Sequence, residues 1–230
     1  MSSQRKFSWV LGLKILTVVL GAGFVAGFTY NFRETQRRAD QIARLEEAFN
    51  ELRAALNVDS VRQYHVQRIM KIIEQANPDM ESALRYEIAS EIYEMSQKYT
   101  NLDVDLIAAT ISQETGGSWD PQLVSPAGAI GLMQVMPSTG QFIAHYEGIT
   151  WSDPMSVLTN PIYNIRIGCR YLSALIERYG LEGGLAAYNA GERCAAQWLA
   201  GGKAEGLLPA ETQQYVPAVL ELYRKGKQSS

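Results

Sequence analysis

The first feature along the chain is an apolar stretch near the N-terminus. From Phe7 to Phe28 the only charged residue is Lys14, and glycines are frequent, as in helices that cross a bilayer. The pattern predicts a transmembrane anchor within residues 1–32, with its basic start on the cytoplasmic side. A cleaved signal peptide is the alternative, because Ala22–Gly23 and Ala26–Gly27 suit a cleavage site. In both cases the rest of the chain is exported.

Beyond this stretch the chain becomes polar and carries a regular apolar seam. Alternating steps of three and four residues, the spacing of a coiled coil, relate Ile42, Leu45, Phe49, Leu52 and Leu56. The seam is only about two heptads long, so a stalk that packs on its own domain fits equally well. We predict a helical stalk over residues 33–79, in which residues 33–76 offer a surface for a protein partner or for self-association.

Two further stretches repeat apolar residues with the helical period. Residues 62–76 and 84–99 each carry one apolar face, and Asn77 and Pro78 separate them, because proline does not continue a helix. The face of the first stretch consists of Val66, Ile69, Met70 and Ile73. These faces are most simply the core stripes of a packed domain.

From Asp103 onward the chain is richer in small residues, glycines and aromatics, while the helical period persists. Asp103 or Asp105 can cap a short apolar helix, and another helix is expected over residues 163–179, with Gly180 at its end. No stretch alternates with the period of a strand. The pattern therefore predicts a mainly α protein, in which an anchor and a helical stalk precede one all-α domain over residues 80–225.

Composition and charge exclude several classes of protein. With 21 Lys and Arg against 24 Asp and Glu residues, the net charge is −3, and no basic cluster suits nucleic acid. Two cysteines and two dispersed histidines cannot form a structural zinc site, so we expect neither a metal nor an organic cofactor. In an exported protein, Cys169 and Cys194 can either pair or remain separate thiols.

One carboxylate has a setting that suits catalysis. Glu114 follows the apolar stretch of residues 107–113 and precedes a polar, glycine-rich stretch that ends at Trp119. If that stretch lines a cleft, burial raises the pKa of Glu114, so that it holds a proton near neutrality, as a general acid for a glycosidic oxygen must. On spacing alone, a solvated glutamate at a helix end is the simpler interpretation, because most glutamates are exposed.

A series of short motifs changes that interpretation. After Glu114 the chain carries, in order, Trp119-Asp120-Pro121, Ser125, Gly131-Leu132-Met133-Gln134, Asn164-Ile165, Gly168, Tyr171-Leu172, Tyr188-Asn189-Ala190-Gly191, Glu211-Thr212 and Tyr215-Val216. Over about half of its length, the chain closely resembles the lytic transglycosylase (SLT) family of peptidoglycan-cleaving enzymes. Two features depart from the family pattern: Thr115 replaces the usual serine, and two extra residues, most simply Gly116 and Gly117, lengthen the following loop.

The resemblance implies a lysozyme-like helical fold and a particular reaction. Family members cleave the β-1,4 bond between N-acetylmuramic acid and N-acetylglucosamine without water, because the 6-hydroxyl of the muramic acid displaces the leaving group and forms a 1,6-anhydro ring. Glu114 is expected to protonate the leaving oxygen and then to accept the proton of that hydroxyl. A second carboxylate close by would indicate hydrolysis; of the two candidates, the resemblance assigns Asp120 to a turn and Glu211 to substrate binding.

The same resemblance implies which residues line the sugar cleft. Besides the catalytic Glu114, they are Ser125, Met133, Gln134, Tyr188, Asn189, Glu211 and Tyr215. Tyr188 and Asn189 are expected beside the scissile bond, and Tyr215 on one wall. Met133 and Tyr188 can also be core residues, whereas a buried Asn189 amide needs partners, one of which an N-acetyl group would supply.

Together, these expectations describe a single-pass protein of the bacterial cytoplasmic (inner) membrane, with its catalytic domain on the periplasmic side and peptidoglycan glycan strands as its substrate. A hydrolase of the goose-lysozyme kind is the first alternative; it shares the fold but leaves a reducing end. The second alternative is a non-catalytic wall-binding or assembly protein that uses the stalk to bind a partner. The presence of Glu114, Gln134 and Asn189 speaks against this second alternative.

Overall fold

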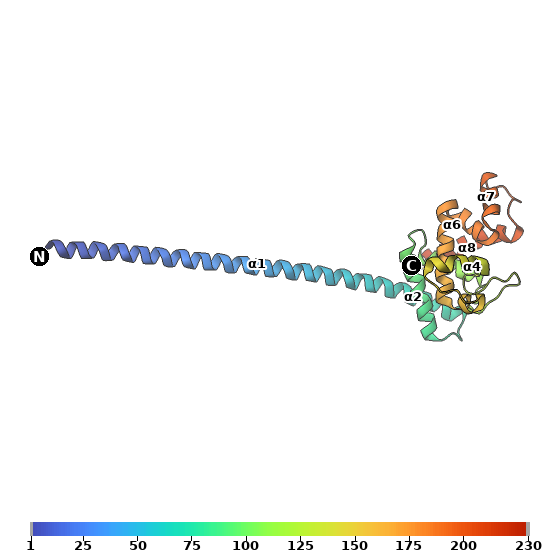
Figure 1. Cartoon of the computed structure of the whole chain (residues 1–230), viewed down its shortest axis with the longest axis horizontal. Helices are drawn as coiled ribbons and strands as arrows, with labels where there is room; N and C mark the ends of the chain where they lie inside the picture. Colours follow the sequence, from blue (N-terminus) through green and yellow to red (C-terminus); the bar gives the residue numbers. More distant parts are fainter. Residues whose placement is uncertain (1, 229–230) are drawn as a thin grey trace. The chain divides into compact units, whose positions relative to one another are not determined.

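A computed structural model describes the backbone of residues 2–228 and the side chains of residues 29, 31–38, 40–51, 53 and 58–228. The chain divides into two compact units, Met1–Ser60 and Val61–Ser230. Helix α1 (Ser2–Ala76) makes up the first unit and provides the opening turns of the second (Figure 1).

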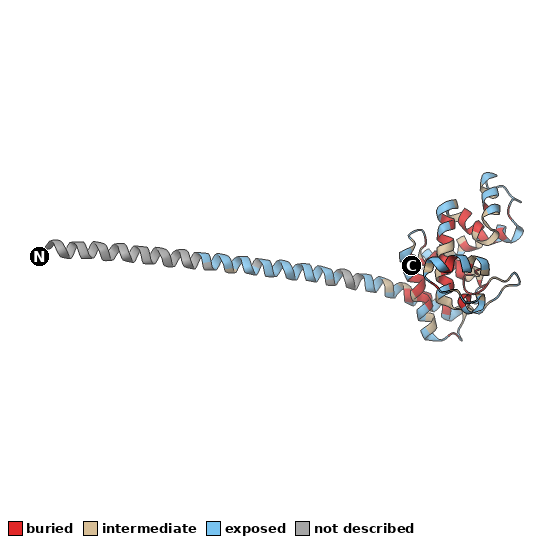
Figure 2. Ribbon diagram, viewed as in Figure 1, coloured by how far each residue is buried: buried red, intermediate tan, exposed pale blue. Residues whose placement is uncertain are grey.

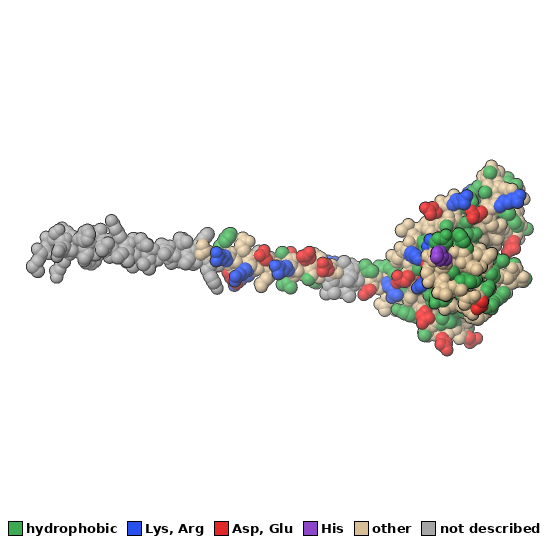
Figure 3. Space-filling view, viewed as in Figure 1, with side chains coloured by type: hydrophobic (Ala, Val, Ile, Leu, Met, Phe, Trp, Pro, Cys, Tyr) green, Lys and Arg blue, Asp and Glu red, His purple; other side chains and the backbone are tan. Residues whose placement is uncertain are grey.

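In the first unit, most described side chains of α1 are polar or charged. Side chains of both charges are interspersed along it (Figure 3), and Arg38 forms an ion pair with Glu34 at 3.1 Å. Within the residues that the structure describes, no helix has an apolar stretch long enough to cross a membrane. The predicted membrane segment, residues 7–28, lies outside the described side chains, as does most of the anchor predicted over residues 1–32.

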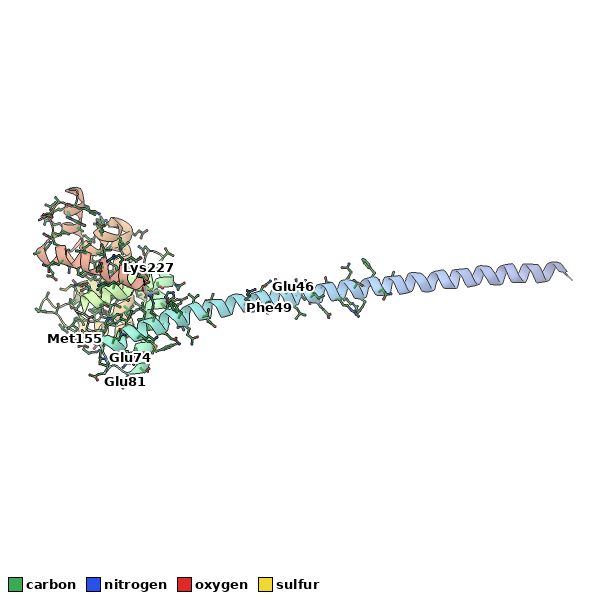
Figure 4. The ribbon with its side chains drawn as sticks, turned by 180° about the vertical axis from the view of Figure 1, so that it is seen from behind. Glu46, Phe49, Glu74, Glu81, Met155 and Lys227 are labelled. Atoms are coloured by element: carbon green, nitrogen blue, oxygen red, sulfur yellow. The ribbon has the colours of Figure 1, made fainter. Side chains whose placement is uncertain are left out.

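The apolar seam of the stalk is exposed where its side chains are described. Ile42, Leu45 and Phe49 are 57%, 70% and 64% exposed, and Figure 4 shows Phe49 projecting from α1. Leu52 and Leu56 lie outside the described side chains. Association through residues 33–76, with a partner or a second copy, stays a prediction.

The second unit is helical, which confirms the predicted mainly α fold. Within the described residues it contains no extended strand, only isolated bridges that pair Ile130 with Val124 and with Val135. After α1, its elements are α2 (Ser82–Lys98), α3 (Val104–Glu114), α4 (Pro137–Ala144), the 3-10 helix η1 (His145–Glu147), α5 (Pro154–Leu158), α6 (Pro161–Ala190), α7 (Glu192–Ala200) and α8 (Ala210–Gln228) (Figure 1).

The last turns of α1 pack into the core of the second unit. Val66, Ile69 and Ile73 are buried, as expected for a core stripe (Figure 2). Residues 61–79, which the sequence pattern assigned to the stalk, therefore belong to the second unit. In this segment Arg68 forms an ion pair with Asp105 of α3 at 2.6 Å and donates to a backbone carbonyl near the end of α8 at 3.1 Å.

Helices α3 and α8 form an antiparallel pair. Asp103 caps α3, as predicted, by accepting a hydrogen bond from the Leu106 N–H at 2.9 Å. The same carboxylate accepts from the Tyr223 hydroxyl and from Lys227 Nζ, both at 2.7 Å, near the end of α8. The start of α3 is thus fixed against the end of α8, and this arrangement places the end of α3 beside the start of α8.

Helix α6 bends at Gly180, the residue predicted to end a helix there. Gly180 has φ 73° and ψ 174°, after which the chain resumes the helix up to Ala190. A positive φ of this kind strains residues that carry a side chain, so glycine suits the bend. The helix expected over residues 163–179 is therefore the first arm of one bent element, and Asn189 lies near the end of the second arm.

The two cysteines are separate thiols. Cys169 is buried in α6, with its Sγ 3.7 Å from the Sδ of Met133, and Cys194 is half-buried in α7. Burial raises the pKa of the Cys169 thiol, which keeps it protonated and unreactive. The sequence left open whether Cys169 and Cys194 form a disulfide; in the structure they do not.

Candidate active site

Glu114 is the last residue of α3 and is half-buried. The Tyr215 hydroxyl, from α8, donates a hydrogen bond to Glu114 Oε1 at 2.6 Å. Burial raises the pKa of Glu114 to about 7, against the lowering effect of the Tyr215 hydrogen bond and with a further rise from the negative charge of Glu211. Near neutral pH this carboxyl therefore exists in both protonation states.

The loop after Glu114 accommodates both departures from the family pattern. Gly116 and Gly117 have φ values of 57° and 82°, in the left-handed region that glycine tolerates best, so the chain turns away directly after α3. The buried Thr115 hydroxyl accepts a hydrogen bond from the Trp119 N–H at 3.2 Å, and the Trp119 side chain is buried. Neither Thr115 nor the longer loop therefore moves the end of α3 away from Glu114.

The segment from Ser125 to Gln134 forms a compact loop held by its own polar groups. Ser125 Oγ accepts a hydrogen bond from the Ala129 N–H at 3.0 Å. Gln134 Nε2 donates to the carbonyls of Gly131 at 2.8 Å and of Leu123 at 3.3 Å. The amide nitrogen of Gln134 is thereby used within the loop, which leaves its amide oxygen as the group available to a ligand.

Met133 and Tyr188 have different environments. The Met133 side chain is 0% exposed and lies in the core. It packs against Gly168 of α6, where a Cβ atom would lie only 2.5 Å from Met133 Sδ. Its backbone carbonyl accepts a hydrogen bond from the half-buried Tyr188 hydroxyl at 2.7 Å. The sequence allowed Met133 either to line the sugar cleft or to lie in the core. In the structure it lies in the core, because Gly168 leaves room for its side chain.

Asn189 and Glu211 come from neighbouring helix ends. Asn189, near the end of α6, accepts a hydrogen bond at Oδ1 from the Thr212 hydroxyl at 2.6 Å. Its Nδ2 has no hydrogen-bond partner among the residues that the structure describes. Glu211 is exposed in the first turn of α8.

These elements enclose a cleft of about 430 Å³. Its walls come from the end of α3, the loop of residues 125–136, the second arm of α6 and the start of α8. The lining residues are Gln113, Glu114, Ser125, Ala127, Ala129, Gln134, Met136, Tyr188, Asn189, Glu211, Gln214 and Tyr215. The structure therefore brings together every predicted site residue except Met133.

Comparison with known families identifies the domain that contains this cleft. Residues 91–206, half of the chain, match the transglycosylase SLT domain. The chain belongs to this family. The match includes Glu114 and Asn189, whereas Glu211 and Tyr215 follow it on α8.

Individual relatives of the SLT domain are lytic transglycosylases. The soluble lytic murein transglycosylase of Escherichia coli K12 is 35% identical over 115 residues, 45% of this chain and 18% of that protein. The endo-type membrane-bound lytic murein transglycosylase A of Klebsiella pneumoniae subsp. pneumoniae is 44% identical over 75 residues, 32% of this chain and 36% of that protein. The X-ray structure of an inactive mutant of lytic transglycosylase Slt from Pseudomonas aeruginosa matches 61% of this chain and 24% of its own, with 30% identity and a TM-score of 0.55. The chain thus spans well under half the length of these relatives.

In the SLT domain, Asn164 supports the cleft loop from behind. Its Oδ1 accepts a hydrogen bond from the Met133 N–H at 2.7 Å, and its Nδ2 donates to the carbonyls of Ile130 at 2.8 Å and Leu158 at 2.9 Å. Any side chain at Gly131 would collide with this amide, so glycine is required there. One buried residue of α6 thereby fixes the backbone directly before and within the motif that ends in Gln134.

The two candidate second carboxylates, Asp120 and Glu211, have different locations. Asp120 does not line the cleft; its Oδ1 accepts the Gln122 N–H at 2.9 Å, as expected for a turn residue. Glu211 lines the cleft and raises the pKa of Glu114. Within the described residues, Glu211 is therefore the carboxylate that shares the cleft with Glu114.

Sequence reasoning missed three polar residues of the site. Gln113 and Gln214 line the cleft, and each directly precedes a predicted site residue, Glu114 and Tyr215. Thr212 was recognised within a motif, but its contact with Asn189 was not expected. The sequence signal for Thr212 is its place in the Glu-Thr pair at the start of a helix. This signal does not reveal that Asn189 is its hydrogen-bond partner.

Proposed function

We propose that this protein is a peptidoglycan lytic transglycosylase in which Glu114 acts first as general acid and then as general base. The observation that carries the proposal is the state of Glu114: it lines a cleft, and burial raises its pKa to about 7. A carboxyl with this pKa donates and accepts protons at neutral pH without a large energetic cost in either direction. Membership of the SLT family supports the same reaction class.

The proposed reaction uses one carboxyl group twice. Protonated Glu114 gives its proton to the glycosidic oxygen as the bond from that oxygen to the muramic acid breaks. The 6-hydroxyl of the same muramic acid then bonds to the anomeric carbon and releases its proton to the Glu114 carboxylate. The carboxyl returns to its starting state, no water is consumed, and the product carries a 1,6-anhydro ring.

The other lining residues are proposed to hold the sugars around the scissile bond. Asn189 offers an amide N–H without another described partner, which suits the carbonyl of an N-acetyl group. Gln134 offers its amide oxygen, and Tyr188 lies against the loop that carries it. Ser125 and Glu211 complete the polar lining.

Mass spectrometry of digested peptidoglycan tests this function. Purified sacculi are incubated with the full chain in detergent, wild type beside Glu114→Gln, and the muropeptides are analysed by mass. Anhydromuropeptides that disappear with the variant are expected. Products one water heavier would make the protein a hydrolase of the goose-lysozyme kind, and sacculi that bind both proteins but stay intact would favour the non-catalytic alternative.

We further propose that residues 1–32 anchor the enzyme in the cytoplasmic membrane, with a helical stalk and the catalytic domain following on the periplasmic side. The support is the apolar sequence from Phe7 to Phe28 and its basic start. The intact mass of the protein from a carbonate-washed membrane fraction tests this proposal. Full-length protein in that fraction is expected, whereas a shortened chain in the soluble fraction would indicate a cleaved signal peptide.

A further inference from the structure

The hydrogen bond of Thr212 differs from that of other threonines in this chain. Thr110, Thr115 and Thr159 each donate to the carbonyl four positions earlier, at 2.9, 2.8 and 2.6 Å. Thr212 is 1% exposed, yet its hydroxyl donates at 2.6 Å to the side chain of Asn189, on another helix. This bond joins the first turn of α8 to the end of α6 at the cleft.

The position of Thr212 in the first turn of α8 explains why its hydroxyl bonds outside its own helix. The carbonyl four positions before Thr212, that of Leu208, accepts a hydrogen bond from Gln213 Nε2 at 2.8 Å. Leu208 lies two positions before the first residue of α8, so Thr212, in the first turn, has no carbonyl of its own helix four positions earlier. A buried hydroxyl proton needs an acceptor, and Asn189 Oδ1 supplies it.

The direction of this bond fixes the orientation of the Asn189 amide. If the amide were turned over, Nδ2 would face the Thr212 oxygen, and the buried hydroxyl proton would lose its described acceptor. With Oδ1 toward α8, Nδ2 is the group that Asn189 offers to the cleft. An N–H donor in this position recognises a carbonyl oxygen.

We propose that Thr212 is a positioning residue that holds Asn189 with its N–H donor toward the carbonyl of a substrate N-acetyl group. The proposal rests on the proposed function, because it assigns the ligand group to an N-acetylated sugar. Without the threonine hydroxyl, the Asn189 side chain rotates freely and presents an oxygen to that carbonyl in part of its orientations. Binding and turnover then fall although every residue that touches the sugar is present.

Three variants of the full chain separate positioning from packing. Thr212→Val keeps the shape of the side chain and removes the hydroxyl; Thr212→Ser keeps the hydroxyl; Thr110→Val removes a buried hydroxyl that bonds within α3. We expect Thr212→Val to lower kcat/KM on sacculi about tenfold and the other two to lower it less than about twofold. In an Asn189→Ala background, Thr212→Val should cause no further loss, because the two residues act as one unit.

The pH dependence of kcat/KM distinguishes positioning from a general displacement of α8. Tyr215 on the same helix lowers the pKa of Glu114, so a displaced α8 would move the alkaline limb of the profile. We expect this limb to stay in place in Thr212→Val while the height of the profile falls. A shifted limb, or equal losses in Thr212→Val and Thr212→Ser, would overturn the positioning role.

A binding measurement makes this proposal separable from the reaction itself. Affinity for tri-N-acetylchitotriose is measured by calorimetry for the wild type, Thr212→Val and Thr212→Ser. Weaker binding by the valine variant alone supports the positioning role even if no sacculi are cleaved, in which case only the proposed reaction fails. Equal affinity of the two variants, or no binding by a wild type that cleaves sacculi, rejects the positioning role and leaves the reaction standing.

Discussion

The Tyr215 hydroxyl and Glu114 Oε1 lie 2.6 Å apart, and the same two helices form a second tyrosine–carboxylate pair at their other ends. There the Tyr223 hydroxyl donates to Asp103 Oδ2 at 2.7 Å. Burial acts to raise the pKa of both carboxyls. At Asp103 burial is outweighed by the hydrogen bonds from Lys227, Tyr223 and the Leu106 N–H together with the charge of Lys227, so the pKa lies below its usual range. Glu114 has no cation partner among the described residues, and its pKa reaches about 7. Without a lysine partner among the described residues, the pKa of the Glu114 carboxyl stays near neutral pH.

Tyr215→Phe should move the alkaline limb of the kcat/KM profile to higher pH. The Tyr215 hydrogen bond lowers the pKa of Glu114, so its loss raises that pKa further above the ordinary value. Because Glu114 must be protonated to act as the acid, activity then persists to more alkaline pH. The maximum itself should fall about tenfold, because the hydroxyl no longer holds the carboxyl in place. Initial rates of sacculus solubilisation between pH 5 and pH 9 measure both effects.

Tyr223→Phe is the matched control for that experiment. It removes the same atom from the same helix, but at Asp103, outside the cleft. We expect a loss of stability of about 1 kcal/mol and an unchanged alkaline limb. If both variants moved the limb equally, the effect would belong to the α3–α8 packing and not to the hydrogen bond at Glu114.

Glu211→Gln should move the alkaline limb in the opposite direction. The negative charge of Glu211 raises the pKa of Glu114, so a neutral glutamine lowers it and the acid loses its proton at lower pH. Asp120→Asn is the control, because Asp120 is a turn carboxylate outside the cleft and asparagine keeps its acceptor oxygen. The charge contribution is screened by salt, so the shift should shrink when the profile is repeated at high ionic strength. A limb that stays in place in both variants at low salt would contradict the assignment.

Much of this site could be predicted from the sequence because the features that define it are local. The helix that ends at Glu114 follows from an apolar run with an aspartate cap, and the end of the first arm of α6 at Gly180 follows from a glycine after a helical pattern. The lining residues came from the order of family motifs. These features depend on neighbours within a few positions, which a single sequence displays.

The remaining features depend on packing between distant segments. Met133 belongs to the core because Gly168, far along the chain, has no side chain where its sulfur lies. Thr212 of α8 donates its hydroxyl to Asn189, at the distant end of α6. The turns of α1 after residue 60 share the helical period of the stalk before them, so periodicity alone did not separate the two units.

Glu114→Gln should stabilise the protein at alkaline pH while it abolishes activity. The pKa of Glu114 is raised from its ordinary 4.5 to about 7, so the protonated form favours the folded state; this stabilisation is complete below pH 4.5 and is lost as the pH rises through 7. Glutamine keeps the uncharged form at every pH. We expect the variant to be more stable than wild type by about 3 kcal/mol at pH 9 and by under about 1 kcal/mol at pH 5. Urea unfolding at both pH values tests this; an equal difference at both would show that burial of the charge carries no cost.

Asn164→Ala should destabilise the fold more than the loss of any helix cap in the same region. The substitution leaves the Met133 N–H and the carbonyls of Ile130 and Leu158 without their described partner in the core, which should cost about 3 kcal/mol or more. Asn160→Ala, which removes only the cap of α6 near solvent, should cost about 1 kcal/mol. Urea unfolding followed by tryptophan fluorescence compares the two.

Asn164→Asp shows which of the hydrogen bonds of Asn164 matters most. An aspartate keeps an acceptor for the Met133 N–H but faces the carbonyls of Ile130 and Leu158 with oxygen where the amide donated. If the two donated bonds hold the loop, the aspartate should be at least as damaging as alanine, because a buried carboxylate or its proton must be placed between two carbonyls. Near-wild-type stability in the aspartate variant would mean that the bond from the Met133 N–H to residue 164 alone positions the loop, and Gln134 would then keep its place at the cleft without the two bonds that Asn164 donates.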